Sequence, residues 1–287
     1  MALAHRPART RAPLVGVRGA GDLATGVIHR LHRAGFAVVA TELPQPTVLR
    51  RPVAFASAVW AGTATVEGVT AVRVGPEGVA GALAQGRVAL LVDPHGRQLR
   101  ALGAAVLIDA AMTKRAGGLD RDDAPVVIAL GPGCTAGQEV DAVIETNRGH
   151  HLGRVILEGA AEPDTGVPGP IDGHAAERVL RAPCAGRFLG VRAIADPVGA
   201  GTVVATVEGA RVVAGIAGVL RGLLHDGCEV RAGMKVGDVD PRAEPSHCFT
   251  ISDKARAVAG GALEAVLLLR RQPTRGPWPV GRGVARC

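Results

Sequence analysis

The hydrophobic positions between residues 14 and 42 change their spacing twice. Leu14 to Val17 is a continuous apolar run of the kind that forms a buried parallel strand. After it, apolar side chains recur at helical spacing until Gly35: Leu23, Val27, Ile28 and Leu31. A second apolar run, from Phe36 to Thr41, ends at Glu42. The pattern predicts a strand, an amphipathic helix and a second strand, which together form a parallel βαβ unit.

Three more apolar runs follow, at residues 88–92, 105–108 and 126–130. They end at Asp93, at Asp109 and at a loop that contains Gly131 and Gly133. Apolar strands that end in Asp or in a glycine-rich loop fit a parallel sheet whose functional groups lie along one edge. We therefore expect these ends to lie near one another. The alternative is that the two aspartates only cap helices or form turns.

The segment after residue 180 contains an internal repeat. Residues 182–186 match residues 214–218 at an offset of 32, and Val-rich strands alternate with glycine turns in both halves. This resembles the barrel-sandwich fold of biotinyl and lipoyl carrier domains, which present a modified lysine on the hairpin that joins the halves. That hairpin would be residues 207–211, which contain no lysine, and Lys235 lies in a different turn. We expect no covalent biotin or lipoate.

A helix is predicted to begin after Ser252, a favourable N-cap residue. Gly260 and Gly261 interrupt it and would each cost about 1 kcal/mol relative to alanine. Either another element or a ligand must therefore approach the backbone closely there.

The expected fold class is α/β, with a Rossmann-like parallel sheet domain, a small all-β barrel-sandwich module and a C-terminal helix. The expected organisation is a disordered basic tail, the Rossmann-like nucleotide-binding domain, a linker, the sandwich module, the helix and a mobile tail. Their respective ranges are residues 1–13, 14–160, 161–179, 180–243, 244–272 and 273–287.

Gly19, Gly21 and Ala24 form a G-x-G-x-x-A fingerprint between the first strand and its helix. Gly19 would permit the tight turn, Gly21 would let backbone amides approach a pyrophosphate, and Ala24 would allow close helix packing. Glu42 follows Gly21 by 21 residues, where a ribose acceptor is expected and where a carboxylate disfavours NADP. The residues expected to hold a nucleotide are Arg18, Gly19, Gly21, Asp22, Leu23, Ala24, Thr25, Glu42, Asp93, Asp109, Gly131 and Gly133. The alternative is that the glycines serve only the turn, with Asp22 as the helix cap.

Composition narrows the classes of partner. The net charge is +7, yet four Phe, two Trp and no Tyr leave almost nothing on which bases could stack, so no nucleic acid is expected. Five widely spaced cysteines without a C-x-x-C pair suggest neither a disulfide framework nor zinc, and His150 and His151 have no companion ligand, so no metal is expected. No stretch approaches 18 apolar residues, and we expect a cytoplasmic protein without membrane contact; a homo-oligomer is compatible with the sequence.

Six motifs in order resemble the YqeB family: RGAGDLATGV from Arg18, ELPQP from Glu42, GPGCTAG from Gly131, VIETNRGHHLGRVI from Val143, DVDPR from Asp238 and SDKARAVAGGALEAVL from Ser252. The resemblance covers about residues 14–270. It implies an accessory protein of the selenium-dependent molybdenum hydroxylase system, with hydroxylase subunits or other maturation factors as partners. It transfers no catalytic residue.

Three hypotheses follow from the resemblance and the fingerprint together. The first is a maturation factor that binds a nucleotide or the molybdopterin dinucleotide cofactor, with residues 131–137 as a second anion nest and Cys134 as a sulfur or selenium relay if its thiol pKa is lowered. The second is an NAD-dependent oxidoreductase, for which Lys114 and His95 could transfer protons. The third is a non-catalytic nucleotide-sensing scaffold. Cys134 could equally be a small buried residue, and the residues are compatible with an enzyme or with a protein without turnover.

Overall fold

The structure is a computed structural model that describes residues 13–113, 118–164, 166 and 169–270. Lys114 and the two predicted tails, apart from Pro13, lie outside these residues.

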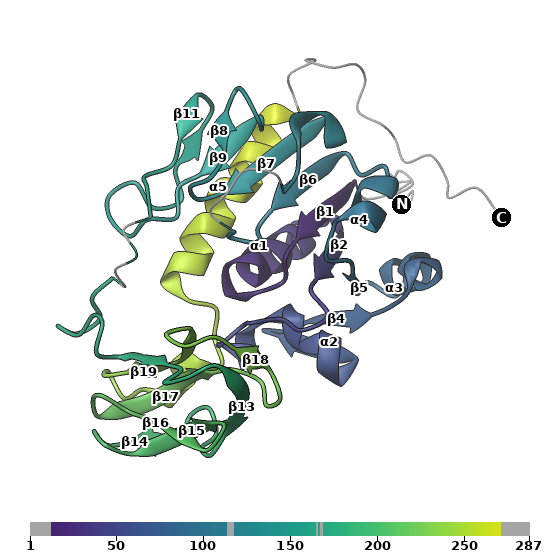
Figure 1. Cartoon of the computed structure of the whole chain (residues 1–287). Helices are drawn as coiled ribbons and strands as arrows, with labels where there is room; N and C mark the ends of the chain where they lie inside the picture. The colour runs from purple at the N-terminus through teal and green to yellow at the C-terminus, as the bar shows by residue number, and fades with distance from the viewer. Residues whose placement is uncertain (1–12, 114–117, 165, 167–168, 271–287) are drawn as a thin grey trace, which may run out of the picture.

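Within the described residues, the larger sheet has nine strands in the order β10-β9-β7-β6-β1-β2-β5-β4-β3 (Figure 1). Strands β9 to β4 of this order run parallel, and β10 and β3 pair antiparallel at its two edges. The strands are β1 (Leu14–Arg18), β2 (Ala37–Glu42), β3 (Thr63–Val66), β4 (Val69–Arg73), β5 (Val88–Val92), β6 (Val106–Asp109), β7 (Val126–Leu130), β9 (Ala142–Ile144) and β10 (Val155–Ile156). Strand β1 lies between β2 and β6, and the chain crosses to the β6 side of the sheet after β5.

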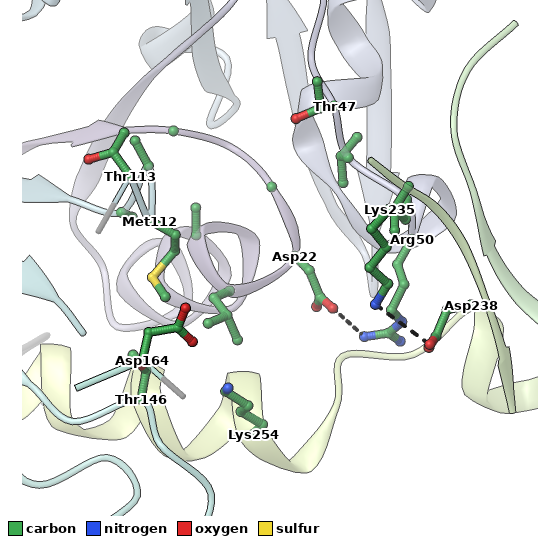
Figure 2. A pocket seen from close by; sticks show the side chains of 18 of the residues that line it. Asp22, Thr47, Arg50, Met112, Thr113, Thr146, Asp164, Lys235, Asp238 and Lys254 are labelled. Carbon is green, nitrogen blue, oxygen red and sulfur yellow. Dashed lines mark hydrogen bonds and ion pairs between the residues drawn. The ribbon is translucent and has the colours of Figure 1, made fainter. Parts of the chain in front are cut away.

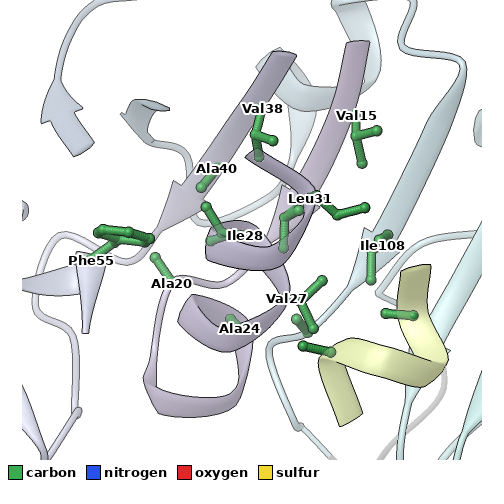
Figure 3. Packing of buried hydrophobic residues seen from close by; sticks show 14 of the residues in the cluster. Val15, Ala20, Ala24, Val27, Ile28, Leu31, Val38, Ala40, Phe55 and Ile108 are labelled. Carbon is green, nitrogen blue, oxygen red and sulfur yellow. The ribbon is translucent and has the colours of Figure 1, made fainter. Parts of the chain in front are cut away.

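The predicted first strand, helix and second strand are confirmed as β1, α1 (Asp22–Arg33) and β2. One face of α1 buries Val27, Ile28 and Leu31 against side chains of β1, β2 and β6 (Figure 3). These three side chains are fully buried, which explains why the helical spacing was readable in the sequence. The helix ends at Arg33 with Ala34 as its C-cap, and Gly35 then takes a φ of 93°, which turns the chain toward β2.

Helices cover both faces of this sheet. The C-terminal helix α5 (Asp253–Leu269) packs beside α1 on one face, and the short helices α3 (Val79–Ala84) and α4 (Arg97–Ala101) cover the other. Ser252 caps α5 as predicted, because its Oγ accepts a hydrogen bond from Ala255 N over 3.2 Å. A short helix, α2 (Ala58–Ala61), lies near β3 and β4.

The two glycines of α5 differ. A Cβ added to Gly261 would lie 2.0 Å from the carbonyl oxygen of Gly153, whereas at Gly260 it would meet only the end of Arg30 at 3.8 Å. Another element, and not a ligand, therefore approaches the backbone at Gly261. A similar close contact joins the two helices, since a Cβ on Gly26 would lie 2.8 Å from Ala255 O.

The second unit, residues 179–240, consists in the described residues of two four-stranded sheets packed around their own core, and we call it the sandwich unit. The sheet orders are β12-β19-β17-β14 and β16-β15-β13-β18. Its strands are β12 (Val179–Arg181), β13 (Gly186–Gly190), β14 (Pro197–Val198), β15 (Val203–Val207), β16 (Ala210–Val213), β17 (Gly218–Leu223), β18 (Glu229–Val230) and β19 (Lys235–Asp240). The offset of 32 relates β13 to β17, β14 to β18 and β15 to β19, so the predicted repeat is present in the structure.

The remaining short elements are a two-stranded ladder and five 3-10 turns in the described residues. They are β8 (Thr135–Ala136), β11 (Gly159–Ala160), η1 (Arg51–Val53), η2 (Phe55–Ser57), η3 (Pro76–Gly78), η4 (Arg121–Asp123) and η5 (Pro245–Cys248).

Direct contacts fix the two units against each other. Leu223 N donates to Leu49 O over 2.9 Å, and Arg51 Nε donates to Leu223 O over 2.8 Å. The rings of Trp60 and His225 stack with their centroids 4.2 Å apart. In Figure 1 the sandwich unit, in green, lies below the larger sheet, and the yellow α5 returns from it to that sheet.

Candidate functional site

A cleft of about 950 Å³ lies between the two units. The glycine loop after β1, the ends of β2 and β5, and the segment after β6 line one side of it, so it opens at the carboxyl edge of the parallel strands. Strands β12, β17 and β19 of the sandwich unit line the other side. The cleft is therefore built from segments that lie more than 150 residues apart in the sequence.

The two fingerprint glycines have different structural needs. Gly19 has a φ of 96°, and a Cβ there would lie 3.0 Å from the Ala110 carbonyl, so the turn itself requires glycine. Gly21 has a φ of −69°, and an added Cβ would meet nothing within 4 Å. Gly21 is the N-cap of α1, and no side chain caps that helix. The first-turn amides of α1 therefore face the cleft without a capping side chain.

Glu42 lines the cleft, but both oxygens of its carboxylate accept hydrogen bonds from backbone amides. Its Oε1 accepts from Ala20 N over 3.1 Å and its Oε2 from Leu43 N over 2.6 Å. Burial raises the pKa of Glu42 and outweighs the effect of these amides. Glu42 therefore holds the glycine loop against the end of β2, in addition to any contact that it makes with a ligand.

The aspartates at the ends of β5 and β6 are helix and loop anchors. Asp93 accepts hydrogen bonds from the amides of Arg97, Gln98 and Leu99 and so caps α4. Asp109 accepts from Arg18 Nη1 over 2.9 Å and from the amides of Ala111 and Leu119. The contacts of both aspartates are therefore those expected if they cap a helix or hold a turn. Asp93 and Arg18 still line the cleft, whereas Asp109 does not.

Several other predicted residues lie apart from the cleft lining. Thr25 is buried, donates to Ala20 O over 3.0 Å and accepts from Phe55 N over 2.9 Å, so its hydroxyl fixes the loop. Of the loop 131–137 only Pro132 lines the cleft; Gly131 and Gly133 do not. His95 is exposed and is likewise not part of the lining. Leu23, Ala24 and Asp22 do line it.

The surroundings of Cys134 do not favour the lowered thiol pKa on which the relay hypothesis depends. Burial raises the pKa of the Cys134 thiol, and the carboxylates of Asp109 and Glu139 raise it further. The residue is followed by the short strand β8 and not by a helix. Cys134 is instead packed against the apolar core on the α3 and α4 side of the sheet.

The sequence pattern did not indicate the cations that enter the cleft from the loop after β2 and from the sandwich unit. Arg50, only 7% exposed, donates to Asp22 Oδ2 over 2.8 Å and to the carbonyls of His247 and Thr250. Figure 2 shows Asp22 and Arg50 pointing toward each other, with Lys235 and Asp238 beyond Arg50. Arg50 is followed by Arg51, and the sequence contains no signal that distinguishes the buried arginine from its neighbour.

Two buried arginines of the sandwich unit also line the cleft. Arg178 donates to Asp238, which Lys235 Nζ approaches to 3.6 Å. Arg221 lies on β17, and its nearest charged partner is Asp240, 3.6 Å from its Nε. An arginine inside the otherwise apolar strand 218–223 is the signal that could have identified it.

The cleft lining carries eight Arg or Lys and six Asp or Glu side chains among the described residues. The carboxylates of Glu42, Asp93 and Asp238 are already hydrogen-bonded to protein groups. The cleft is therefore suited to an anionic ligand. No group of three or more His, Cys, Asp or Glu in the described part of the chain could hold a metal ion. No helix there is long and apolar enough to cross a membrane.

The chain has a clear relative among known proteins. The chain is 48% identical over 260 residues to a protein of Escherichia coli (strain K12) with the name uncharacterized protein YqeB. The alignment covers 90% of this chain and 48% of the relative, so the chain spans about half the length of the curated relative that it matches. No protein-family model matches the sequence.

Solved structures are more distant. The product-bound ectoine utilization protein EutE (DoeB) from Ruegeria pomeroyi aligns at 12% identity over 79% of this chain and 85% of that one, with a TM-score of 0.26. An aspartoacylase family protein from Mesorhizobium loti aligns at 12% identity over the same shares, also with a TM-score of 0.26. Similarity at this level does not establish a shared fold.

Proposed function

The chain belongs to the YqeB family, and from that premise we propose that it is an accessory protein for the maturation of a molybdenum hydroxylase that binds a nucleotide or a dinucleotide cofactor in the cleft. Molybdopterin dinucleotide is the ligand that the family resemblance favours. Its partners would be hydroxylase subunits or other maturation factors.

Strand order supports a Rossmann-like interpretation of the larger unit. Strands β5, β2, β1, β6, β7 and β9 lie side by side, which is the order 3-2-1-4-5-6 of dinucleotide-binding sheets. In such sheets the ligand binds where the chain order reverses, here between β1 and β6. The cleft opens at this point.

The observation that carries the proposal is the open space over Gly21. Gly19 must be glycine for the turn, but no contact in the described structure demands glycine at position 21. A missing side chain there leaves the first-turn amides of α1 accessible from a cleft rich in arginine and lysine. Backbone amides at a helix N-terminus favour phosphate, both through their N–H groups and through the helix dipole.

The sandwich unit fits a role in binding and not in group transfer. Its strands repeat at an offset of 32 residues, which supports the barrel-sandwich interpretation. The hairpin from β15 to β16 has no lysine that could carry a modification. Instead, the sheet with β12, β17 and β19 forms one side of the cleft. We infer that this unit closes the ligand site.

A thermal-shift screen tests the proposal. Wild type, Gly21→Asp and Gly81→Asp would be compared with NAD, NADP, FAD, ATP, CTP, GTP and molybdopterin dinucleotides. Gly81 is an exposed helical glycine with open space around it, so it controls for the substitution itself. A ligand at 100 times its dissociation constant stabilises a protein by about 2.7 kcal/mol. We expect one ligand to stabilise wild type and Gly81→Asp but not Gly21→Asp.

The remaining hypotheses give other results. Stabilisation of all three variants alike would place the ligand away from Gly21 and contradict the proposed site. Stabilisation of none of them by any ligand would remove the nucleotide proposal and leave a scaffold. Oxidation of NADH with a carbonyl substrate would favour the oxidoreductase. The maturation role would be supported if the chain co-purified with a molybdenum hydroxylase and no longer did so when the hydroxylase lacked its cofactor.

A further inference from the structure

We propose that Arg221 of the sandwich unit binds a second phosphoryl group of the ligand whose first phosphoryl group lies at the N-terminus of α1. The ligand class is then a compound with at least two linked phosphoryl groups, held from both units at once. This inference rests on the proposed function and specifies the ligand of the same cleft.

Arg221 is a buried cation that makes no hydrogen bond within the part of the chain that the structure describes. It is 7% exposed and lines the cleft, and its Nε is buried without an acceptor. Among the described residues its only charged contact is the 3.6 Å approach to Asp240 Oδ2. A guanidinium carries five N–H donors, and burying a donor such as this Nε–H without an acceptor is costly. Something absent from the polypeptide itself would complete this site.

Asp240 cannot serve as the full partner, because Arg242 already occupies it. The Arg242 side chain donates to Asp240 Oδ1 over 2.9 Å and to Oδ2 over 2.6 Å, and its backbone amide donates to Oδ1 as well. Removing Arg221 would therefore not leave Asp240 unpaired. The guanidinium of Arg221 is the surplus positive charge in this group.

The neighbouring cations make an anion more favourable. Burial lowers the pKa of Arg221 and the positive charge of Arg50 lowers it further, and together they outweigh the opposite effect of the nearby carboxylates of Asp240, Asp238 and Asp22. Arg50 is fixed by Asp22 and two backbone carbonyls, and Arg178 by Asp238 and the Gly169 carbonyl. The Nε atoms of Arg50 and Arg178 are also buried without an acceptor, but both guanidinium groups are anchored through other nitrogens. Arg221 has no such anchor in the described part of the chain, and its planar fork suits phosphoryl oxygens.

The position of Arg221 is fixed relative to α1. Two residues beyond it, Leu223 donates its amide to Leu49 O and accepts from Arg51 Nε, which joins β17 to the larger unit. Arg50, between these two contact residues, is bonded to Asp22 at the first position of α1. The helix terminus and Arg221 are thus held across the cleft without any closing movement.

Isothermal titration calorimetry on the full chain tests the inference. Orthophosphate, AMP, pyrophosphate, NAD and CTP would be titrated into wild type, Arg221→Met, Arg221→Lys and Gly21→Asp. We expect Arg221→Met to weaken pyrophosphate and at least one of NAD and CTP about 10- to 100-fold, since a charged hydrogen bond is worth about 1.5 to 3 kcal/mol. Orthophosphate and AMP should change less than threefold, and Arg221→Lys should lie between.

A second measurement separates ligand binding from a structural role. Without ligand, Arg221→Met should keep or raise the melting temperature, because the substitution removes a desolvated charge. A marked fall in that temperature, or unchanged diphosphate affinity in Arg221→Met while Gly21→Asp abolishes binding, would overturn the inference and leave the proposed function intact. Equal binding to Gly21→Asp and wild type, or no binding of any probe to wild type, would instead remove the proposed function and this inference together.

Discussion

Arg50 Nη1 donates to Asp22 Oδ2 over 2.8 Å and so ties the loop after β2 to the first residue of α1. The same guanidinium donates from Nη2 to the carbonyls of His247 and Thr250, just before α5. Asp22 is consequently an ion-pair partner and not a side-chain cap of α1, because no side chain caps that helix. One buried arginine thus holds three distant segments together beside the cleft.

Replacing Arg50 should destabilise the protein. Arg50→Met would leave Asp22 and two carbonyls without their donor, and breaking a buried pair costs about 3 kcal/mol. Urea unfolding would measure the loss, with Arg192→Met, an exposed arginine of the sandwich unit, as the control. A loss below about 0.5 kcal/mol, the usual range for surface substitutions, would show that the pair contributes little.

The two adjacent glycines of α5 should respond in opposite directions. Gly261→Ala would force a Cβ onto the Gly153 carbonyl, and overpacking of this kind costs about 1 to 3 kcal/mol. Gly260→Ala meets only a flexible arginine end and should gain about 0.5 to 1 kcal/mol from helix propensity. Thermal unfolding of the two variants provides the comparison. Equal effects would contradict the close approach of the segment before β10 to α5.

Gly19 and Gly21 of the glycine loop should also differ in how much their replacement by alanine destabilises the protein. Gly19→Ala places a side chain at a φ of 96° against Ala110 and should cost at least about 1 kcal/mol. Gly21→Ala keeps an allowed backbone and open space, so its stability should stay within about 0.5 kcal/mol of wild type. Chemical denaturation measures both. A large loss at Gly21 would mean that the fold itself requires that glycine.

Asp253 should make stability depend on pH. The hydrogen bond from Arg148 holds the pKa of Asp253 well below its ordinary value, and a depressed acid pKa stabilises the fold above the unfolded pKa, about 3.9. That contribution is lost as the pH falls through the lower folded pKa. Because the carboxylate is 71% exposed, solvent screening limits it to a few tenths of a kcal/mol, at most about 1. Asp253→Asn should be less stable than wild type at pH 7, and this difference should shrink below pH 4; a constant difference would contradict the assignment.

Cys134 should be a slow nucleophile. A raised pKa keeps the thiol protonated at neutral pH, so alkylation should reach half its maximal rate above the pH typical of a free cysteine, about 8.5. Peptide mapping after labelling would follow the site, with Cys134→Ser to identify its peptide. Cys134→Ser should also leave cofactor modification unchanged in a reconstituted assay. Rapid labelling at pH 6 would restore the relay hypothesis.

The sequence by itself determined the local elements. The change from a continuous apolar run to helical spacing predicted β1, α1 and β2 because burial on one face imposes that period directly. The offset of 32 predicted the repeated strands, and Ser252 predicted the start of α5. Gly19 and Gly21 were correctly placed in the turn between β1 and α1, since the φ of a turn and the start of a helix depend on neighbouring residues.

Only the tertiary structure decided which polar groups have partners. Asp93, Asp109 and Glu42 all lie at the ends of buried strands. In the folded chain each carboxylate accepts hydrogen bonds from backbone amides or from an arginine. The cations opposite them, Arg50 and Arg221, come from the loop after β2 and from the other unit. Charge has no period along a chain, and the energy of a buried ion depends on what long-range packing places within a few ångströms. The position of the glycine loop between β1 and α1 could therefore be predicted from the sequence, and the arginines that line the same cleft could not.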